Sequence, residues 1–177
     1  EAAAVFDAGA AHLTHLYNAM PGIHHRNPGP IGAASERESV TAELICDGHH
    51  VHPSAVRMAF KLFPDRICLI SDALRCCGMP DGQYTLGGQS VFLSGGVARL
   101  ADGTIAGSAA NLYDCMRNAV AFGIPMEDAV LSATAIPARE IGRAGETGAI
   151  ADGLPADFVV CGEALERRAV YLGGVRL

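Results

Sequence analysis

The sequence predicts an α/β fold in which part of a β/α barrel is combined with a small β-domain. Two apolar runs, 39–48 and 66–73, are long enough for buried strands and are separated by a helix-like segment at 53–63. Apolar strands that alternate with helices indicate a parallel sheet covered on both faces. By contrast, residues 82–107 alternate apolar and polar side chains between glycine-rich turns, which is typical of short antiparallel strands.

The individual elements follow from apolar periodicity and from helix and turn signals. Gly9 suits the end of a helix, and Pro53 suits the first turn of another. The expected helices are 2–8, 53–63, 111–123 and 125–142, and the expected parallel strands are 11–16, 39–48 and 66–73, with a glycine- and proline-rich loop up to about residue 34. The tail 148–177 is expected to form short strands and turns.

These elements group into two domains, each built from separated segments. We assign 1–81 and 104–142 to the C-terminal half of a β/α barrel, and 82–103 and 143–177 to a small β-sandwich domain. A domain rarely starts without methionine in the middle of a helix, as this chain does. A processed or trimmed terminus is one explanation, and the other is that an N-terminal half of the barrel is missing from these residues.

The composition is that of a soluble globular protein. The 177 residues are 50% hydrophobic and 18% charged, which argues against disorder. No apolar run approaches the roughly 20 residues that cross a bilayer, and the first residues do not resemble a signal peptide, so we expect no membrane partner and a cytoplasmic location. The net charge of −6 gives no reason to expect nucleic acid. The six cysteines are scattered through apolar runs, which favours reduced, unpaired thiols.

Three polar side chains stand at or just after the ends of successive predicted strands: His15, His50 and Asp72. Parallel sheets and barrels bind ligands at that edge. Each residue alone has a plain structural explanation, but three such residues at the ends of successive strands favour a functional site. Neutral imidazole ligates zinc, and a carboxylate beside a metal-activated water is suited to acid–base catalysis. The pattern therefore favours metal-assisted hydrolysis.

Arg26 and His50 form a different kind of pair. The planar guanidinium fork matches phosphate oxygens, and a partly protonated imidazole adds a second positive donor. We expect these two residues to bind an anionic group such as phosphate. We expect His12 to pack against the opposite side of its strand, and we assign no role to the remaining histidines.

Seven short motifs run in order along essentially the whole chain: THLYNAMP, HHRNPG, DGHHVHP, LISDA, DGTIAGSA, IPAREIG and G-x-I-x-x-G-x-x-A-D. Together they resemble the N-acetylglucosamine-6-phosphate deacetylase family of the amidohydrolase superfamily. The resemblance implies the (β/α)8 TIM-like barrel of metal-dependent hydrolases, present here in part, with a small β-sandwich domain. It also implies hydrolysis of the N-acetyl amide of N-acetylglucosamine 6-phosphate to glucosamine 6-phosphate and acetate.

The same resemblance implies roles for individual residues. His15 matches a metal ligand, and Asp72 matches the catalytic aspartate that activates the attacking water and then protonates the departing amine. Substrate contacts are matched by Asn18, Ala19, Ala106, Gly107 and Ser108. Arg26 and His50 match a phosphate-binding pair that acts across a homodimer in the family. The implied cofactor is a divalent metal, zinc foremost, with iron or another divalent cation as alternatives.

The chain departs from the family in its metal ligands. A glutamate and a second ligand histidine of the family lie on earlier strands and would precede Glu1. With His15 alone, a four-coordinate zinc site cannot be completed, so we expect this chain by itself to be inactive. Two alternatives stay open. One is a non-catalytic phosphosugar-binding or assembly module. The other is a different hydrolase of the superfamily, dihydroorotase-like or deaminase-like, which the phosphate pair disfavours.

Overall fold

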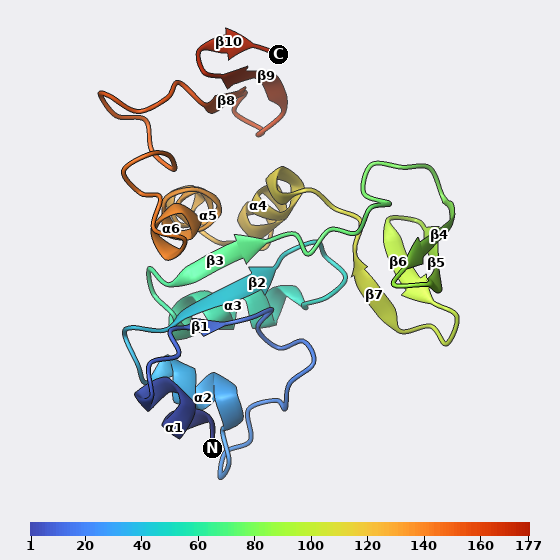
Figure 1. The fold of residues 1–177 in the computed structure, drawn as a ribbon, viewed down its shortest axis with the longest axis vertical. Coiled ribbons are helices and arrows are strands. Elements are labelled where there is room, and N and C mark those ends of the chain that lie inside the picture. Colours follow the sequence, from blue (N-terminus) through green and yellow to red (C-terminus); the bar gives the residue numbers. More distant parts are fainter.

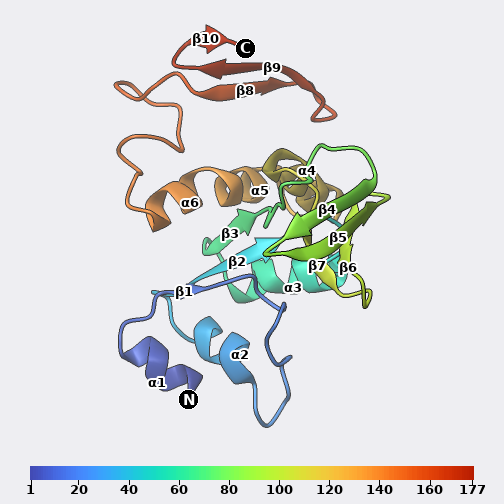
Figure 2. The same cartoon turned by 45° about the vertical axis from the view of Figure 1, so that its right-hand side comes forward.

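In the computed structural model, residues 1–177 form six helices and ten strands, which are arranged in three separate sheets (Figures 1 and 2). The helices are α1 (Ala2–Asp7), α2 (Gly29–Ser35), α3 (Pro53–Leu62), α4 (Leu112–Ala121), α5 (Met126–Ala133) and α6 (Ala135–Glu140). The strands are β1 (His12–Leu13), β2 (Thr41–Ile45), β3 (Ile67–Ile70), β4 (Gly82–Leu86), β5 (Gln89–Ser94), β6 (Val97–Leu100), β7 (Ile105–Ser108), β8 (Phe158–Cys161), β9 (Arg167–Leu172) and β10 (Val175–Arg176).

The central sheet is parallel and has the order β1–β2–β3, which confirms the predicted β/α arrangement. Helix α3 provides the crossover from β2 to β3. It begins with Pro53 in its first turn, and the ring Nδ1 of His52 accepts the Ser54 N–H at 3.2 Å. Proline is well placed there because its missing N–H would have no partner in a first turn.

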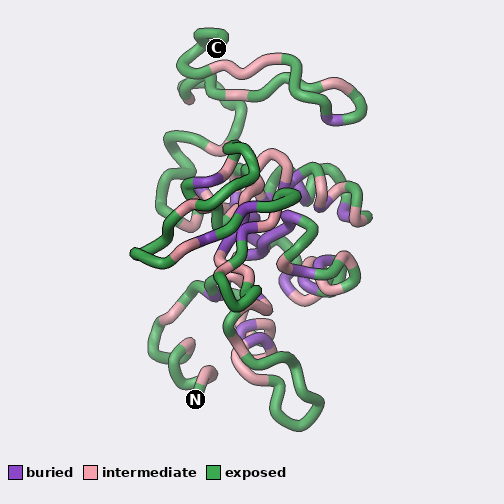
Figure 3. Tube along the Cα trace, turned by 90° about the vertical axis from the view of Figure 1, so that its right-hand side faces the viewer, coloured by how far each residue is buried: buried purple, intermediate pink, exposed green.

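The largest hydrophobic core lies against one face of this sheet. Alternate residues of β2, Ala42 and Leu44, join a cluster of 20 buried residues that also takes in side chains from α3, α4 and α5. Thr41, Glu43 and Ile45 alternate with them and therefore point to the opposite face. Figure 3 shows the buried residues concentrated at the centre of the molecule, with exposed segments at both ends.

Two antiparallel sheets flank this centre. The first has the order β4–β5–β6–β7 and its own small core, and an isolated parallel bridge from Ala73 to Ser108 joins β7 to the segment after β3. The second has the order β10–β9–β8 and lies apart from the first in Figures 1 and 2. The antiparallel strands were predicted correctly, but no hydrogen-bonded sheet joins 82–103 to 143–177, so their assignment to one β-sandwich domain stays a prediction.

Three elements differ from the sequence expectations. The helix predicted over 125–142 is two helices, α5 and α6, separated at Thr134. The break is explained by Pro137, which has no N–H for the Ala133 carbonyl and clashes with it in a continuous helix. The glycine- and proline-rich loop contains the short helix α2, which buries Ile31 and Ala34. Strand β1 covers only two residues, so His15 lies in the following turn.

No helix of the structure combines the length and apolar character needed to cross a membrane.

Replacing Arg66 by alanine should destabilise the fold. Its guanidinium donates to the carbonyls of Arg37 at 2.7 Å and Val40 at 2.8 Å, with longer bonds to two further carbonyls. Hydrogen bonds from charged donors contribute about 1.5–3 kcal/mol each, and we expect Arg66→Ala to lower the free energy of unfolding by about 3 kcal/mol. Urea unfolding measures this change. Lys61→Ala, on an exposed face of α3, is the control. An equal loss of stability in both variants would contradict the stabilising role of the Arg66 hydrogen bonds.

Candidate active site

The candidate site is formed by residues that follow the carboxyl ends of β1, β2 and β3. His15 lies two residues after β1, His50 lies five residues after β2, and Asp72 lies two residues after β3. Because the three strands are parallel and adjacent, their carboxyl ends share one edge of the sheet. The structure therefore groups the three predicted strand-end residues at the same edge.

The turn after β1 holds His15, Asn18 and Ala19 together. The Asn18 backbone N–H donates to the His15 carbonyl at 2.9 Å, and its side-chain Nδ2 donates to the Leu16 carbonyl at 3.2 Å. His15 has φ 34° and Ala19 has φ 51°, which are left-handed conformations that non-glycine residues seldom adopt. The imidazole Nδ1 of His15 is buried and has no hydrogen-bond partner.

Glu43 in β2 supports this turn from the side. Its Oε2 accepts the backbone N–H of His15 at 3.1 Å, and its Oε1 pairs with His12 Nε2 at 2.9 Å. The second ring nitrogen of His12 lies 3.6 Å from Glu140 in α6. His12 thus points across to β2 and α6, and the carboxylate of Glu43 links it to the backbone of His15.

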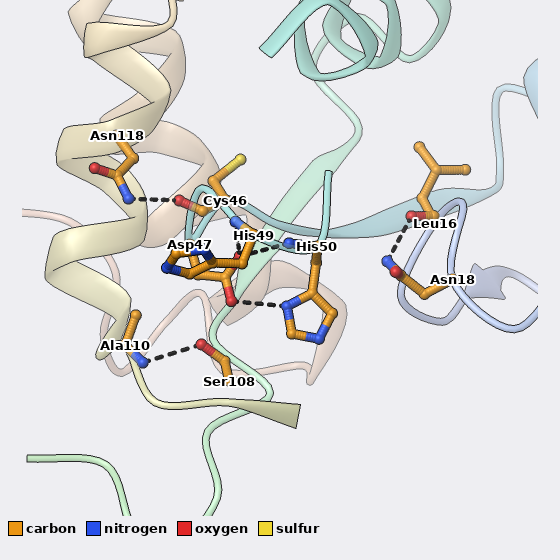
Figure 4. Close-up of polar contacts among 9 residues, drawn as sticks. All are labelled: Leu16, Asn18, Cys46, Asp47, His49, His50, Ser108, Ala110 and Asn118. Carbon is orange, nitrogen blue, oxygen red and sulfur yellow. Dashed lines mark hydrogen bonds and ion pairs between the residues drawn. The ribbon is translucent and has the colours of Figure 1, made fainter. Parts of the chain in front are cut away.

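His50 is held by Asp47, as Figure 4 shows. The two side chains are 8% and 2% exposed, and Asp47 Oδ2 lies 2.7 Å from His50 Nδ1. Burial opposes ionisation of Asp47. Hydrogen bonds from the His50 ring and from the backbone N–H groups of His49 and His50 outweigh it and lower the pKa of the carboxyl well below its usual value.

Asp72 is fixed through its backbone to β7. The Ser108 N–H donates to the Asp72 carbonyl at 2.9 Å, and the Leu74 N–H donates to the Ser108 carbonyl at 2.8 Å. Ser108 itself is buried, and its hydroxyl accepts the Ala110 N–H at 3.0 Å. The Asp72 residue is exposed and has φ 48°. The structure therefore places Asp72 directly beside the predicted substrate-contact stretch of β7, which consists of Ala106, Gly107 and Ser108.

Gly107 permits this close approach. A side-chain carbon at this position would lie 2.9 Å from the Leu74 side chain and 3.2 Å from the Asp72 carbonyl. Only glycine lets the two backbone segments come so near without displacement.

Arg26 is not brought to His50 within the chain. It lies on the exposed loop between β1 and α2, where its Nη1 is 2.7 Å from His25 Nε2 and its backbone N–H donates to His24 Nδ1 at 3.3 Å. The side chain of Arg26 therefore contacts its own loop and not His50.

The cysteines are free, as predicted, and three of the buried ones are poorly suited to act as nucleophiles. Burial raises the pKa of the Cys68 and Cys115 thiols to about 11 and raises that of Cys46 further. A thiol with such a pKa is almost entirely protonated at neutral pH, and the thiolate is the reactive form.

His15 fits a metal ligand, but the chain offers no complete metal centre. Its buried Nδ1 without a partner is the kind of donor that a metal ion would satisfy. No group of three or more histidine, cysteine, aspartate or glutamate side chains in the structure is placed to hold a metal ion. His15 can therefore supply one ligand of a larger set.

Sequence reasoning missed Asp47 and Glu43. A signal for Asp47 was present, because Asp-Gly favours a turn in which the carboxylate accepts N–H groups two and three residues later. The signal for Glu43 was the one charged residue inside the largely buried strand β2. Neither signal identifies the side chain that each carboxylate contacts.

Comparisons with known proteins agree with this architecture. A model of the amidohydrolase family matches residues 2–176. An N-acetylgalactosamine-6-phosphate deacetylase from Escherichia coli O157:H7 is 42% identical over 172 residues, which cover 97% of this chain and 46% of the relative. A putative N-acetylgalactosamine-6-phosphate deacetylase from Escherichia coli (strain K12) is 40% identical, and the match covers 90% of this chain and 96% of that relative.

A solved structure shares the fold. It is a variant of N-acetyl-D-glucosamine-6-phosphate deacetylase from Mycobacterium smegmatis in complex with N-acetyl-D-glucosamine-6-phosphate. The TM-score is 0.91 at 42% identity, and the match covers 99% of this chain and 47% of that one. The chain thus spans about half the length of this enzyme and of the O157:H7 relative, but nearly all of the K12 relative.

Gly107→Ala should separate β7 from the Asp72 segment. The added methyl group meets the Leu74 side chain and the Asp72 carbonyl, and overpacking of this kind costs about 1–3 kcal/mol. Urea unfolding should show this loss of stability. Gly145→Ala is the matched control, because a side-chain carbon there has no neighbour within 4 Å. Unchanged stability of Gly107→Ala would show that the two segments do not depend on their close contact.

Proposed function

This chain belongs to the amidohydrolase family, and we propose that it serves in the hydrolysis of the N-acetyl amide of N-acetylglucosamine 6-phosphate, which yields glucosamine 6-phosphate and acetate. The observation that carries the proposal is the grouping of His15, His50 and Asp72 at the carboxyl edge of one parallel sheet. The names of the relatives and of the solved enzyme–phosphosugar complex support the substrate class.

We propose that the parallel sheet is part of a (β/α)8 barrel. An isolated parallel bridge from Ala73 to Ser108 joins β7 to the segment that follows β3, and this parallel pairing next to β3 supports the proposal. Strand β7 is also the last strand of the antiparallel sheet, so it connects the two parts of the fold. A polypeptide of the length of the relatives would supply the other barrel strands.

We propose a divalent metal at His15, because members of the family are generally metal-dependent. Zinc is a cation that imidazole ligates well, with iron or another divalent cation as alternatives. When bound, such a metal would supply Lewis-acid chemistry, which polarises an amide carbonyl and lowers the pKa of water. The remaining ligands would come from residues outside this chain, since His15 has no partner ligands here.

Asp72 is the proposed general base and acid. Its exposed carboxylate takes a proton from the water that attacks the amide carbonyl, and then delivers a proton to the departing amine nitrogen. The backbone bonds between Ser108 and the segment 72–74 fix the Asp72 backbone, and they would thereby help to position its carboxylate beside the substrate. Proton delivery matters because an amine leaves an amide readily only when it is protonated.

The remaining predicted residues would bind the sugar phosphate. We propose that Asn18, Ala19, Ala106, Gly107 and Ser108 contact the sugar. His50 and Arg26 would bind the phosphate, with Arg26 acting on the site of a second subunit. The exposed loop of Arg26, which makes no contact with His50, supports this homodimer arrangement. A cytoplasmic location stays a prediction.

The 4-epimer, N-acetylgalactosamine 6-phosphate, is a second candidate substrate. The names of the two Escherichia coli relatives favour it. Comparing kcat/KM for the two epimers with the complete gene product decides between them. If calorimetry detects binding of either phosphosugar but neither metal nor acetate release is found, the chain is a non-catalytic binding module.

Asp72→Asn should abolish deacetylation while leaving metal binding intact. The amide keeps the shape of the side chain but cannot accept the proton of the attacking water, and we expect kcat to fall at least about 100-fold. Acetate release and metal content of the purified complete gene product measure the two effects. Asp102→Asn, in an exposed turn, is the control. Normal turnover of Asp72→Asn would exclude the proposed role.

Arg26→Ala should raise KM for the phosphorylated sugar. A guanidinium–phosphate pair is bidentate and charge-assisted, so its loss should raise KM roughly 10- to 100-fold. KM for the unphosphorylated sugar should change little. Arg26→Lys keeps the charge without the planar fork, so its KM for the phosphorylated sugar should lie between those of the wild type and Arg26→Ala. Equal effects on both sugars would refute phosphate recognition by Arg26.

A further inference from the structure

We infer that Asp47 is a positioning residue for substrate phosphate, because it holds the His50 ring with Nδ1 directed at its own carboxylate and Nε2 available to a phosphate oxygen. The inference deepens the proposed function and rests on it for the identity of the ligand. The orientation of the ring rests on the structure alone.

The contact between the two side chains is short and buried. His50 Nδ1 lies 2.7 Å from Asp47 Oδ2, and the side chains are 8% and 2% exposed. An ionised carboxylate only accepts hydrogen bonds, so the proton of this bond lies on His50 Nδ1. The ring is thereby oriented, and Nε2 is the nitrogen that remains for a ligand (Figure 4).

The carboxylate is itself held in place. Its Oδ1 accepts the backbone N–H groups of His49 and His50, both at 2.9 Å, which closes the turn that follows β2. The preceding residue, Cys46, is tied to α4 because Asn118 Nδ2 donates to its carbonyl at 2.9 Å. Both oxygens of Asp47 thus have partners on the turn, and the turn is anchored to a helix.

This arrangement excludes a direct role for Asp47 and favours one through His50. A carboxylate that is 2% exposed and bonded at both oxygens is not free to ligate a metal or to accept a proton from water. It does compensate the charge of a protonated His50 ring. A charge-assisted N–H from Nε2 would suit phosphate oxygens, because hydrogen bonds to ionised acceptors are the stronger kind.

A double-mutant cycle on the complete gene product tests the inference. The four proteins are the wild type, Asp47→Asn, His50→Ala and the double variant, each measured with the phosphorylated and the unphosphorylated N-acetylhexosamine. In Asp47→Asn the side-chain oxygen can still accept the backbone N–H groups, but the new amide nitrogen cannot accept from His50. We expect KM for the phosphosugar to rise roughly tenfold or more, with kcat and the values for the unphosphorylated sugar little changed.

The double variant separates positioning from a general structural role. If Asp47 acts through His50, adding Asp47→Asn to His50→Ala should raise KM no further, because neighbours that act as a unit are not additive. Full additivity would overturn the inference, as would an unchanged KM for Asp47→Asn. His49→Ala is the matched control, since its backbone N–H to Asp47 is retained, and it should behave as the wild type.

NMR of the imidazole nitrogens provides a readout independent of turnover. We expect the wild type to carry a proton on Nδ1 of His50 at neutral pH, and Asp47→Asn to lose this fixed preference. An unprotonated Nδ1 in the wild type would overturn the inference. Failure of the proposed function has a different result, namely a folded wild type that neither binds nor hydrolyses the phosphosugar. In that case the phosphate role is refuted as well, whatever the ring orientation.

Discussion

Parallel pairing of β1, β2 and β3 is the interaction on which the candidate site depends. Residues on three distant parts of the chain meet only because these strands run in one direction and in fixed register. A slip by one residue would turn every side chain of a strand to the other face. The register is set by the alternating core residues of β2, where Ala42 and Leu44 are fully buried against helices. Packing of one face of the sheet therefore determines where the candidate site residues lie at its carboxyl edge.

The other face of the sheet imposes a second constraint. It carries Glu43 opposite Cys68 in the register, and the carboxylate pairs with His12, which also approaches Glu140. A partly buried charge is tolerable only where it is paired and hydrogen-bonded. Glu43 meets this requirement by pairing with His12 and by accepting the backbone N–H of His15. The same bonds that make the charge acceptable thus fix the turn that presents His15.

Much of the fold and of the site could be predicted from local signals. Apolar runs mark buried strands, and the carboxyl ends of parallel strands share an edge of the sheet. The positions of His50 and Asp72 after two such runs therefore predicted that they lie at that edge. The signals failed where contacts between distant residues decide the outcome. The partner of Asp47 depends on the exact geometry of a turn, and the partners of Glu43 lie on β1 and in the turn that follows it. Pro137 could have been weighed more heavily, since it lies inside the predicted helix and its effect is local.

Backbone strain is found at several residues of the candidate site. Six non-glycine residues have positive φ, and three of them, His15, Ala19 and Asp72, are predicted site residues. Such conformations cost about 1–3 kcal/mol each and persist only where surrounding structure holds them. Here two of these residues are held by bonds to neighbouring strands. Glu43 in β2 accepts the His15 N–H, and Ser108 in β7 donates its N–H to the Asp72 carbonyl. A side chain that must leave a strand at an unusual angle needs the adjacent strand to fix it. His15 and Asp72 therefore lie two residues after paired strands, where such bonds are available.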